Sequence, residues 1–368
     1  MTITERSDAV RNEVWVLGPS GRMGKLIARR LDEAGVPLVL VGRDRGRLES
    51  VASELGRAPR LEVGSLAATL ATLEQDPPGV VVSTVGPFTT TAPEVARACP
   101  PGTHYVDVAN ELSAVQAILD LDRHASGRNQ TFVTAAGFGV LATESVLLRL
   151  CERRPPATRA RVDAMAAIAL EAGVVGPALA ATIVEIVSFG GREVRHGRLV
   201  RARSAAHPLQ LTSPDGDVLR TGSGASGELI AAWRASNADS VVAASTAAPS
   251  SPLVRAILPV VSAVFRLPGV SRFAVGRIAR IRLRAQDMAR ASSWAHARAE
   301  WTDGTVRDGW LRVGDGTEFT ASVAAEVTQR LLAGEGHPGA HTPGSLFGPT
   351  LAEAAGGEFL LDHPATHG

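Results

Sequence analysis

The sequence predicts an α/β protein in which a parallel sheet covered by helices precedes a second domain of different character. Short apolar runs alternate with helical patterns from residue 13 through residue 135, which is typical of a parallel sheet. The first of these runs is followed at once by three regularly spaced glycines. After the charged and proline-rich stretch 151–156, hairpin patterns and long polar segments take over. These three observations predict the fold class.

Residues 13–44 carry the pattern that organises the chain. Val14 to Leu17 form an apolar run typical of a buried strand, and the residues after the glycines have apolar side chains at helical spacing. A second apolar run, Leu38 to Val41, follows at the distance expected of a strand–helix–strand unit.

The glycines of this unit predict a turn that binds a dinucleotide. Gly18 allows a sharp turn off the strand, Gly21 allows backbone N–H groups to approach a pyrophosphate, and Gly24 allows the helix to pack close to the sheet. The helix N-terminus adds unpaired N–H groups and the positive end of a dipole. The spacing is G-x-x-G-x-x-G, whereas the commoner fingerprint is G-x-G-x-x-G. The residues expected to contact the cofactor here are Gly18, Ser20, Gly21, Arg22, Met23 and Gly24.

The end of the second strand predicts NADP(H) as the cofactor. An acid at this place holds the ribose 2′-hydroxyl of NAD, whereas an arginine accommodates the 2′-phosphate of NADP. Here Arg43 comes first, Arg22 can approach the same corner, and a guanidinium can hold a phosphate through two hydrogen bonds. Asp44 is a further candidate cofactor contact, although it also suits the N-cap of the helix that follows.

Two more strand ends are expected at the same edge of the sheet. Residues 80–88 form an apolar strand that runs into a tight loop, and ligands of such sheets lie at the carboxyl ends of the strands. Residues 103–111 form the next strand, with an acidic end. The other residues expected to contact the cofactor are Ser83, Thr84, Val85, Gly86, Pro87, Phe88 and Gly137.

The second half of the chain predicts hairpins and apolar helices. Residues 190–200 suit a hairpin that turns at His196-Gly197, and residues 290–313 suit a longer one that turns at Asp303-Gly304. We expect helices over 112–124, 177–189 and 318–332, a strand over 160–170, and polar turns over 203–226.

Residues 253–275 are apolar with interspersed arginines and contain Pro259 and Pro268. Such a stretch could lie on a membrane surface, but its hydrophobicity favours a buried or dimer-facing helix.

Composition excludes several classes of protein. At 368 residues the chain is long enough for two domains, and a net charge of +1 argues against nucleic acid as a partner. No apolar run reaches the about 18 residues of a membrane-spanning helix, which argues against integral membrane association. No Cys/His cluster has the spacing of a metal site. Two cysteines and the lack of a signal-peptide pattern predict a cytoplasmic location.

Several of these stretches together resemble the saccharopine dehydrogenase-like oxidoreductases. The resemblance lies in residues 18–24, 41–43, 83–88, 102–107 with Glu111, 137–139, 190–191 with 196–199, and 342–348. It implies an NADP-binding Rossmann domain over residues 1–140 and an inserted mixed-sheet α/β domain over residues 141–319. Residues 320–368 are then expected to pack back onto the first domain. The resemblance also implies a small-molecule substrate and a homodimer.

The resemblance leaves the reaction open, because members of this family reduce both C=N and C=C bonds. We favour an NADPH-dependent imine reductase acting on a small metabolite of secondary metabolism. The alternatives are a trans-acting enoyl reductase for a polyketide or lipid, and an NADP-binding scaffold without turnover. The mechanism of short-chain dehydrogenases is excluded, because it needs a lysine four residues after its tyrosine and the single tyrosine, Tyr105, is followed there by Ala109.

The candidate catalytic acids are Asp107, Glu111 and Tyr105, because a proton donor is expected at the carboxyl edge of the sheet. For Asp107 and Glu111 the competing interpretation is a ribose contact or a helix cap. His296 alternates with Trp294 on a predicted strand, and a solvent-facing or interface position is expected for it.

Overall fold

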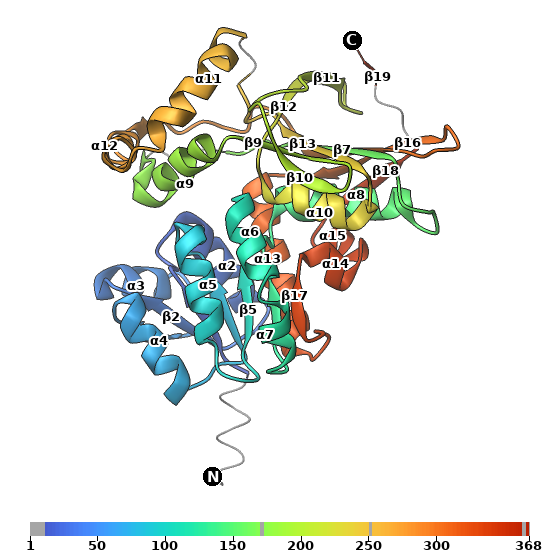
Figure 1. Cartoon of the computed structure of the whole chain (residues 1–368). Coiled ribbons are helices and arrows are strands. Elements are labelled where there is room, and N and C mark those ends of the chain that lie inside the picture. Colours follow the sequence, from blue (N-terminus) through green and yellow to red (C-terminus); the bar gives the residue numbers. More distant parts are fainter. Residues whose placement is uncertain (1–11, 170–172, 250–251, 363–365, 368) are drawn as a thin grey trace. The chain divides into compact units, whose positions relative to one another are not determined.

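The computed structural model describes residues 12–169, 173–249, 252–362 and 366–367, and the chain forms two compact units (Figure 1). The first unit takes in residues 1–109, 113–137 and 317–346. The second takes in residues 110–112, 138–316 and 347–368. Each unit is built around its own sheet.

The first unit contains a seven-stranded sheet with the order β17-β6-β5-β4-β1-β2-β3, in which every pairing is parallel. The order reverses beside β1, as in doubly wound nucleotide-binding sheets. The strand β1 is buried along its whole length because it is central. The strands are β1 (Val14–Leu17), β2 (Leu38–Gly42), β3 (Arg60–Val63), β4 (Val80–Ser83), β5 (His104–Asp107), β6 (Thr131–Val133) and β17 (Gly339–His341).

Helices cover this sheet and enclose a core of branched aliphatic and aromatic side chains. Tyr105 and Phe132 meet edge to face in that core, with ring centroids 5.9 Å apart. The helices are α2 (Arg22–Glu33), α3 (Arg45–Ala52), α4 (Leu66–Gln75), α5 (Phe88–Ala98), α6 (Leu112–Leu119), α7 (Asp122–Ser126), α13 (Gly316–Leu332) and α14 (Pro343–Phe347).

The second unit contains a mixed sheet whose main path is β18-β16-β15-β7-β13-β12-β11-β19, with the hairpin β9–β10 joined to β13. Only β13 and β7 run parallel to each other among the pairings described. Its strands are β7 (Arg159–Met165), β9 (Gly191–Arg195), β10 (Arg198–Ala202), β11 (Leu209–Thr212), β12 (Val218–Ser223), β13 (Ser240–Ser245), β15 (Ser293–Glu300), β16 (Val306–Val313), β18 (Glu358–Leu361) and β19 (Thr366–His367). A separate pair joins β8 (Gly173–Val174) and β14 (Arg282–Leu283).

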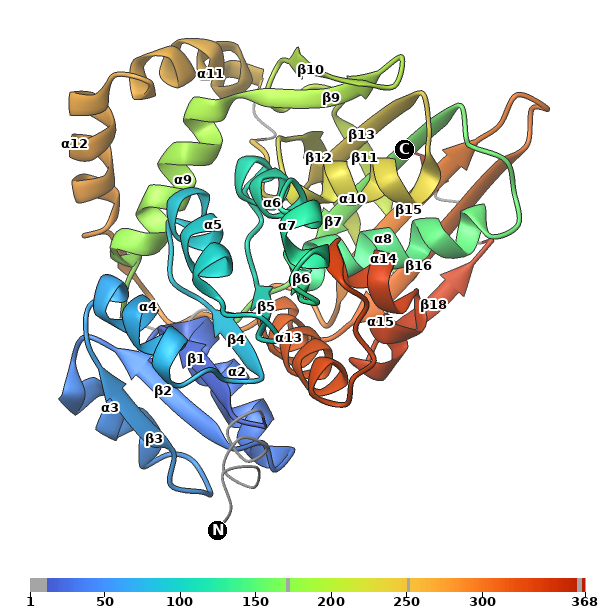
Figure 2. The same cartoon turned by 60° about the horizontal axis from the view of Figure 1, so that its bottom comes forward.

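Two helices, α8 and α10, pack on one face of the mixed sheet (Figure 2). The sequence permits this because β15 presents small residues to that face, where Ala295 and Ala297 are fully buried. A side chain on Gly309 would come within 3.1 Å of Val146 on α8. The helices of this unit are α8 (Phe138–Cys151), α9 (Gly176–Phe189), α10 (Gly227–Ser236), α11 (Pro252–Phe265), α12 (Pro268–Ile278) and α15 (Thr350–Ala354).

The structure confirms the predicted fold class, a parallel-sheet domain with a second α/β domain on a mixed sheet, and both predicted hairpins. Two local predictions are wrong. Residues 203–226 contain the strands β11 and β12, and residues 112–124 form two helices, α6 and α7, where one was expected. The two strands escaped prediction because each is short and carries only two apolar residues, in the sequences Leu-Gln-Leu-Thr and Val-Leu-Arg-Thr-Gly-Ser.

Candidate functional site

The glycine turn after β1 is held in place by the neighbouring strand ends. Gly18 has a φ of +79°, which favours glycine, and its N–H donates to the carbonyl oxygen of Val41 at 3.1 Å. The Thr84 hydroxyl donates to the carbonyl oxygen of Leu17 at 2.8 Å. A side chain on Gly24 would put its Cβ 2.3 Å from the Gly18 carbonyl oxygen. Gly18 and Gly24 are therefore required by the fold itself.

Gly21 differs from the other two glycines. Its backbone is extended, with φ of −79° and ψ of 160°, and the residue is exposed to solvent. A Cβ there would lie 3.4 Å from the Gly18 carbonyl oxygen, an ordinary contact. Gly21 is the N-cap of α2, yet no side chain of the described residues caps this end of the helix and its first turn carries no acid. The fold thus does not explain the missing side chain, whereas close approach of an anion to uncapped N–H groups would.

The end of β2 presents an arginine beside this turn. Arg43 is exposed, and within the described part of the chain neither it nor Arg22 takes part in an ion pair. Asp44 is the N-cap of α3, where its carboxylate accepts a hydrogen bond from the Arg47 N–H at 3.1 Å. The capping interpretation of Asp44 is therefore confirmed, and a contact of Asp44 with a cofactor stays a prediction.

The loop after β4 lies next to the same turn. Ser83 pairs with Leu17 in the sheet and is fully buried, while residues 84–88 are half-buried. The Thr91 hydroxyl donates to the carbonyl oxygen of Val85 at 2.5 Å and so fixes the loop. Phe88 already begins α5. At Gly137 a side chain would come within 3.0 Å of Thr320 on α13, so packing is one reason for this glycine.

Asp107 ends β5 as a buried carboxylate. Its Oδ1 accepts hydrogen bonds from the Ala109 N–H at 3.0 Å, the Thr134 hydroxyl at 2.9 Å and the Ala135 N–H at 2.9 Å. No described residue donates a hydrogen bond to its Oδ2. Burial raises the pKa of the Asp107 carboxyl to about 6, although the hydrogen bonds from Ala135 and Ala109 oppose this shift. Asp107 is thus held rigidly, in a buried place that favours its protonated form more than water does.

Tyr105 lies two residues earlier on the same strand, with its ring in the core of the first unit. Burial raises the pKa of its phenol well above the ordinary value. Its position among core side chains favours a packing role for the ring.

Glu111 lies in a second carboxyl cluster, within the second unit. It is buried, and its Oε1 accepts a hydrogen bond from the Thr182 hydroxyl of α9 at 2.6 Å. Glu111 forms a β-bridge with Ser226, and the Gly227 N–H donates to the carbonyl oxygen of Asn110 at 2.9 Å.

This β-bridge places Glu111 close in the fold to Glu228, in the first turn of α10. Glu228 is buried, and a side chain on Gly139 would come within 2.0 Å of its Oε1. No described residue donates to its Oε2, and burial raises the pKa of the carboxyl. Sequence reasoning missed Glu228, because an acid in the first turn of a helix is also an ordinary partner of the helix dipole.

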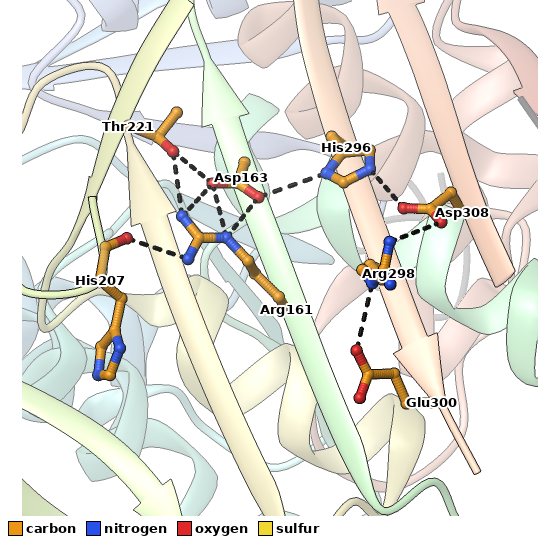
Figure 3. Close-up of polar contacts among 8 residues, drawn as sticks. All are labelled: Arg161, Asp163, His207, Thr221, His296, Arg298, Glu300 and Asp308. Carbon is orange, nitrogen blue, oxygen red and sulfur yellow. Dashed lines mark hydrogen bonds and ion pairs between the residues drawn. The ribbon is translucent and has the colours of Figure 1, made fainter. Parts of the chain in front are cut away.

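A third cluster of charges lies on the mixed sheet (Figure 3). His296 of β15 is fully buried between two acids: its Nδ1 is 3.4 Å from Asp163 of β7, and its Nε2 is 3.1 Å from Asp308 of β16. Burial opposes protonation, but the hydrogen bonds to both acids outweigh it and raise the pKa of His296. The predicted solvent-facing or interface position of His296 is therefore wrong.

Arginines complete this network at both ends (Figure 3). Arg161 binds Asp163 through two nitrogens, Nε at 3.0 Å and Nη2 at 2.8 Å, and the Thr221 hydroxyl donates to the same carboxylate at 2.6 Å. Arg298 donates to Asp308 at 3.2 Å. The pKa of Asp163 is lowered: burial alone would raise it, but the His296 and Arg161 partners reverse the shift. Because these groups pair with one another across β12, β7, β15 and β16, we assign the network a structural role.

The described parts of the chain contain no group of three or more histidine, cysteine, aspartate or glutamate side chains that could hold a metal ion. Likewise, no single helix among the described residues is long and apolar enough to cross a membrane. One bent pair of helices, Val254–Phe265 with Gly269–Ile278, has the length and composition of a membrane span only when the two helices are taken together.

Comparison with known proteins places the fold. The sequence matches no protein-family model and no curated protein sequence. The structure is similar to apo saccharopine dehydrogenase (L-Glu forming) from Saccharomyces cerevisiae, with a TM-score of 0.58 and 12% sequence identity over 95% of this chain and 100% of that one. The chain has the saccharopine dehydrogenase fold. The predicted resemblance is thereby confirmed at the level of the fold.

Two other solved structures are similar to about a third of the chain. One is an NADPH dependent reductase involved in bacilysin biosynthesis, with a TM-score of 0.30 and 13% identity over 34% of this chain and 76% of that one. The other is a short-chain dehydrogenase from Sphingobium yanoikuyae in complex with NADPH, with a TM-score of 0.29 and 20% identity over 33% of this chain and 70% of that one. Beside the saccharopine dehydrogenase fold, which spans nearly the whole chain, these are partial likenesses.

Proposed function

We propose that the protein is an NADPH-dependent oxidoreductase that reduces a C=N bond of a small metabolite. The observation that carries this proposal is Gly21. Packing does not require a glycine at this position. Gly21 lies at the N-terminus of α2, which no side chain of the described residues caps. It also lies in the turn where the strand order of the doubly wound sheet reverses.

The residues of the first unit fit a phosphate-bearing dinucleotide. The N–H groups at the start of α2 would hold the pyrophosphate, and the guanidinium groups of Arg43 and Arg22 would hold the 2′-phosphate. NADPH, when bound, would supply the hydride. Residues 84–88, fixed by the Thr91 hydroxyl, would border the nicotinamide half.

The carboxyl groups favour a cationic substrate. An iminium ion arrives already protonated, so the protein needs anionic groups that hold it more than it needs a strong acid. Asp107 ends β5 at the carboxyl edge, and Glu111 follows four residues later beside Glu228 in the fold. We propose that Asp107 handles the proton of the reaction, and that the buried carboxyls of Glu111 and Glu228 give the second unit a site for positive charge. Tyr105 is the weakest of the catalytic candidates because its ring belongs to the core.

One observation favours an enoyl reductase as the alternative. Reduction of a C=C bond requires a proton at the α carbon after hydride addition, and burial raises the pKa of two carboxyls, Asp107 and Glu228, which favours their protonated forms. The second alternative, a cofactor-binding scaffold, requires tight binding without turnover.

Turnover of the full-length protein separates these functions. NADPH oxidation is followed at 340 nm with a panel of cyclic imines and, in parallel, with α,β-unsaturated thioesters. The proposal expects turnover of imines only, and turnover of thioesters only would establish the alternative. NADPH binding without oxidation by either panel would favour the scaffold.

The variant Asp107→Asn tests the proposed acid. The amide oxygen can still accept the three hydrogen bonds of Oδ1, so the fold is retained. Loss of proton transfer typically lowers kcat by about 10²–10⁴-fold. An unchanged kcat at unchanged thermal stability would remove Asp107 from the reaction.

A further inference from the structure

The helices α11 and α12 present their apolar side chains to solvent. Along α11 the exposed residues Val254, Ile257, Val260 and Val264 follow at intervals of three and four, which places them on one stripe. Val260 is 65% exposed. Beyond α11, Phe273 of α12 is 69% exposed, and Leu267 and Ile281, which lie just outside α12 at its two ends, are exposed as well. These seven residues are called the apolar stripe below.

The opposite side of α11 is attached to the second unit. The Ser262 hydroxyl donates to the carbonyl oxygen of Ser188 on α9 at 3.2 Å, and Arg266 Nε donates to the same oxygen at 3.0 Å. Both α11 and α12 contact α9, and in both views of the whole chain they lie at the rim of their unit, away from the mixed sheet (Figures 1 and 2). The exposed stripe is therefore the outer side of a docked helix pair. For residues 253–275 a buried or dimer-facing helix was expected: a position buried within the chain is wrong, and a dimer-facing one stays a prediction.

The same segment is strongly cationic. Residues 252–286 contain seven arginines and no aspartate or glutamate. Six of the seven arginines are exposed, and none of the seven takes part in an ion pair with a described residue. The arginines of the segment are Arg255, Arg266, Arg272, Arg277, Arg280, Arg282 and Arg284.

This combination selects among possible occupants of the surface. A second copy docking through the same face would bring seven arginines against seven, without an acid from this segment to balance them. A protein partner is less favoured, because the cores of protein interfaces are enriched in aromatic residues and methionine, whereas this stripe is aliphatic except for Phe273; the arginines suit either kind of partner. An apolar stripe flanked by arginines is typical of a helix that lies in the interface of an anionic membrane.

We propose that α11 and α12 bind the protein peripherally to the surface of an anionic lipid bilayer. The apolar stripe enters the boundary between headgroups and acyl chains, and the flanking arginines contact the lipid phosphates. The helices meet at a bend of 117°, which is compatible with both of them lying along the surface. The helices α11 and α12 belong to the second unit and the glycine turn to the first, and the proposal does not depend on the proposed reaction.

Vesicle co-sedimentation of the full-length protein tests the proposal. Vesicles of phosphatidylcholine alone are compared with vesicles that also contain phosphatidylglycerol, at low salt and at 1 M salt. We expect binding to the anionic vesicles, little binding to the neutral ones, and weaker binding at high salt, because about 1 M salt shortens the screening length to about 3 Å.

Matched variants show whether vesicle binding depends on the apolar stripe and its arginines or on any exposed residue of the same type. Val260→Glu should lower vesicle binding at least about tenfold, because it puts a charge into the apolar contact. Val218→Glu changes an equally exposed valine, 60% exposed on β12, and should leave binding unchanged. Arg272→Gln should reduce binding about fivefold, the effect of one basic residue at an anionic surface. Arg198→Gln, an exposed arginine of the hairpin β9–β10, is its control.

Circular dichroism and thermal melting establish that each variant folds. The proposal is overturned if the wild-type protein does not bind anionic vesicles, or if Val260→Glu and Val218→Glu bind equally. A different result would show that this face joins two copies of the chain: the wild type self-associates, the Val260→Glu variant is monomeric, and the wild type does not bind vesicles. Binding of free inorganic phosphate with no binding of vesicles would likewise contradict a membrane surface.

Discussion

Substitution should lower the stability of the protein at one glycine of the turn and leave it nearly unchanged at another. Gly24→Ala should lower the free energy of unfolding by about 1–3 kcal/mol, because its Cβ would overlap the Gly18 carbonyl oxygen and the backbone must shift. Gly21→Ser should stay within about 0.5 kcal/mol of the wild type, because its φ suits any residue and serine is a good N-cap. Chemical denaturation of both variants measures this. Equal losses would show that packing requires both glycines.

Arg43 should decide the preference for NADPH over NADH. Arg43→Gln should weaken NADPH binding about 10–100-fold, since hydrogen bonds to a charged group contribute about 1.5–3 kcal/mol, and should leave NADH binding unchanged. Fluorescence titration with each nucleotide checks this, with Arg123→Gln on α7 as a control for loss of one exposed charge. Equal weakening of both nucleotides would remove the assignment of Arg43 to the 2′-phosphate.

Asp44 offers a test of capping against cofactor binding. Asp44→Ala should lower the free energy of unfolding by about 1 kcal/mol because α3 loses its cap, whereas Asp44→Asn should retain it. If Asp44 acts only as the cap of α3, neither change should alter the affinity for NADPH. If Asp44→Asn weakens nucleotide binding at full stability, the carboxylate contacts the cofactor as well.

His296 makes the stability of the mixed sheet depend on pH. Its pKa is raised in the folded protein, so its stabilising contribution is complete below about pH 6.5, the pKa of an unfolded histidine, and is lost as pH rises through the folded value. We expect the wild type to lose unfolding free energy above about pH 6.5, and His296→Gln to lack this loss while being about 3–5 kcal/mol less stable at pH 6. Tryptophan fluorescence follows this unfolding well, because Trp294 and Trp310 lie in the same sheet. A variant with the wild-type pH profile would contradict a charged His296.

At the scale of elements, the sequence was most informative where one local pattern determines the structure. The strand β1, the glycine turn and α2 follow from apolar runs and glycine spacing, and the hairpin β15–β16 follows from alternation around Asp303-Gly304. The exposed side of α11 could not be predicted this way. Its stripe has the spacing of a buried helix face, and only the docking of Ser262 and Arg266 onto α9 shows that the stripe points outward.

Long-range pairing explains why parts of the candidate site escaped prediction. Glu228 acquires its raised pKa from burial against Gly139, about 90 residues away in the chain. Asp163 and Asp308 balance the positive charge of His296, and they reach it only because β7 and β16 flank β15. Strand order determines such contacts, and the local sequence does not encode it.

At the scale of the whole molecule, the fold supports the chemistry without determining the substrate. The saccharopine dehydrogenase fold accounts for the parallel sheet, in which β17 from residues 339–341 is the last strand, and for the mixed sheet of the second unit. The predicted domain limits and the homodimer stay predictions. Sedimentation equilibrium measures the dimer, and the arginines of α11 and α12 argue that its interface lies elsewhere.

The central claim is that the turn at residues 18–24 binds the phosphates of NADPH. Isothermal titration calorimetry of the full chain tests it most directly, with Gly21→Ser as the matched variant that should fold normally. We expect NADPH to bind the wild type and its affinity to fall at least about tenfold, or about 1.4 kcal/mol, in Gly21→Ser. No binding to the wild type, or equal binding to Gly21→Ser, would contradict the claim.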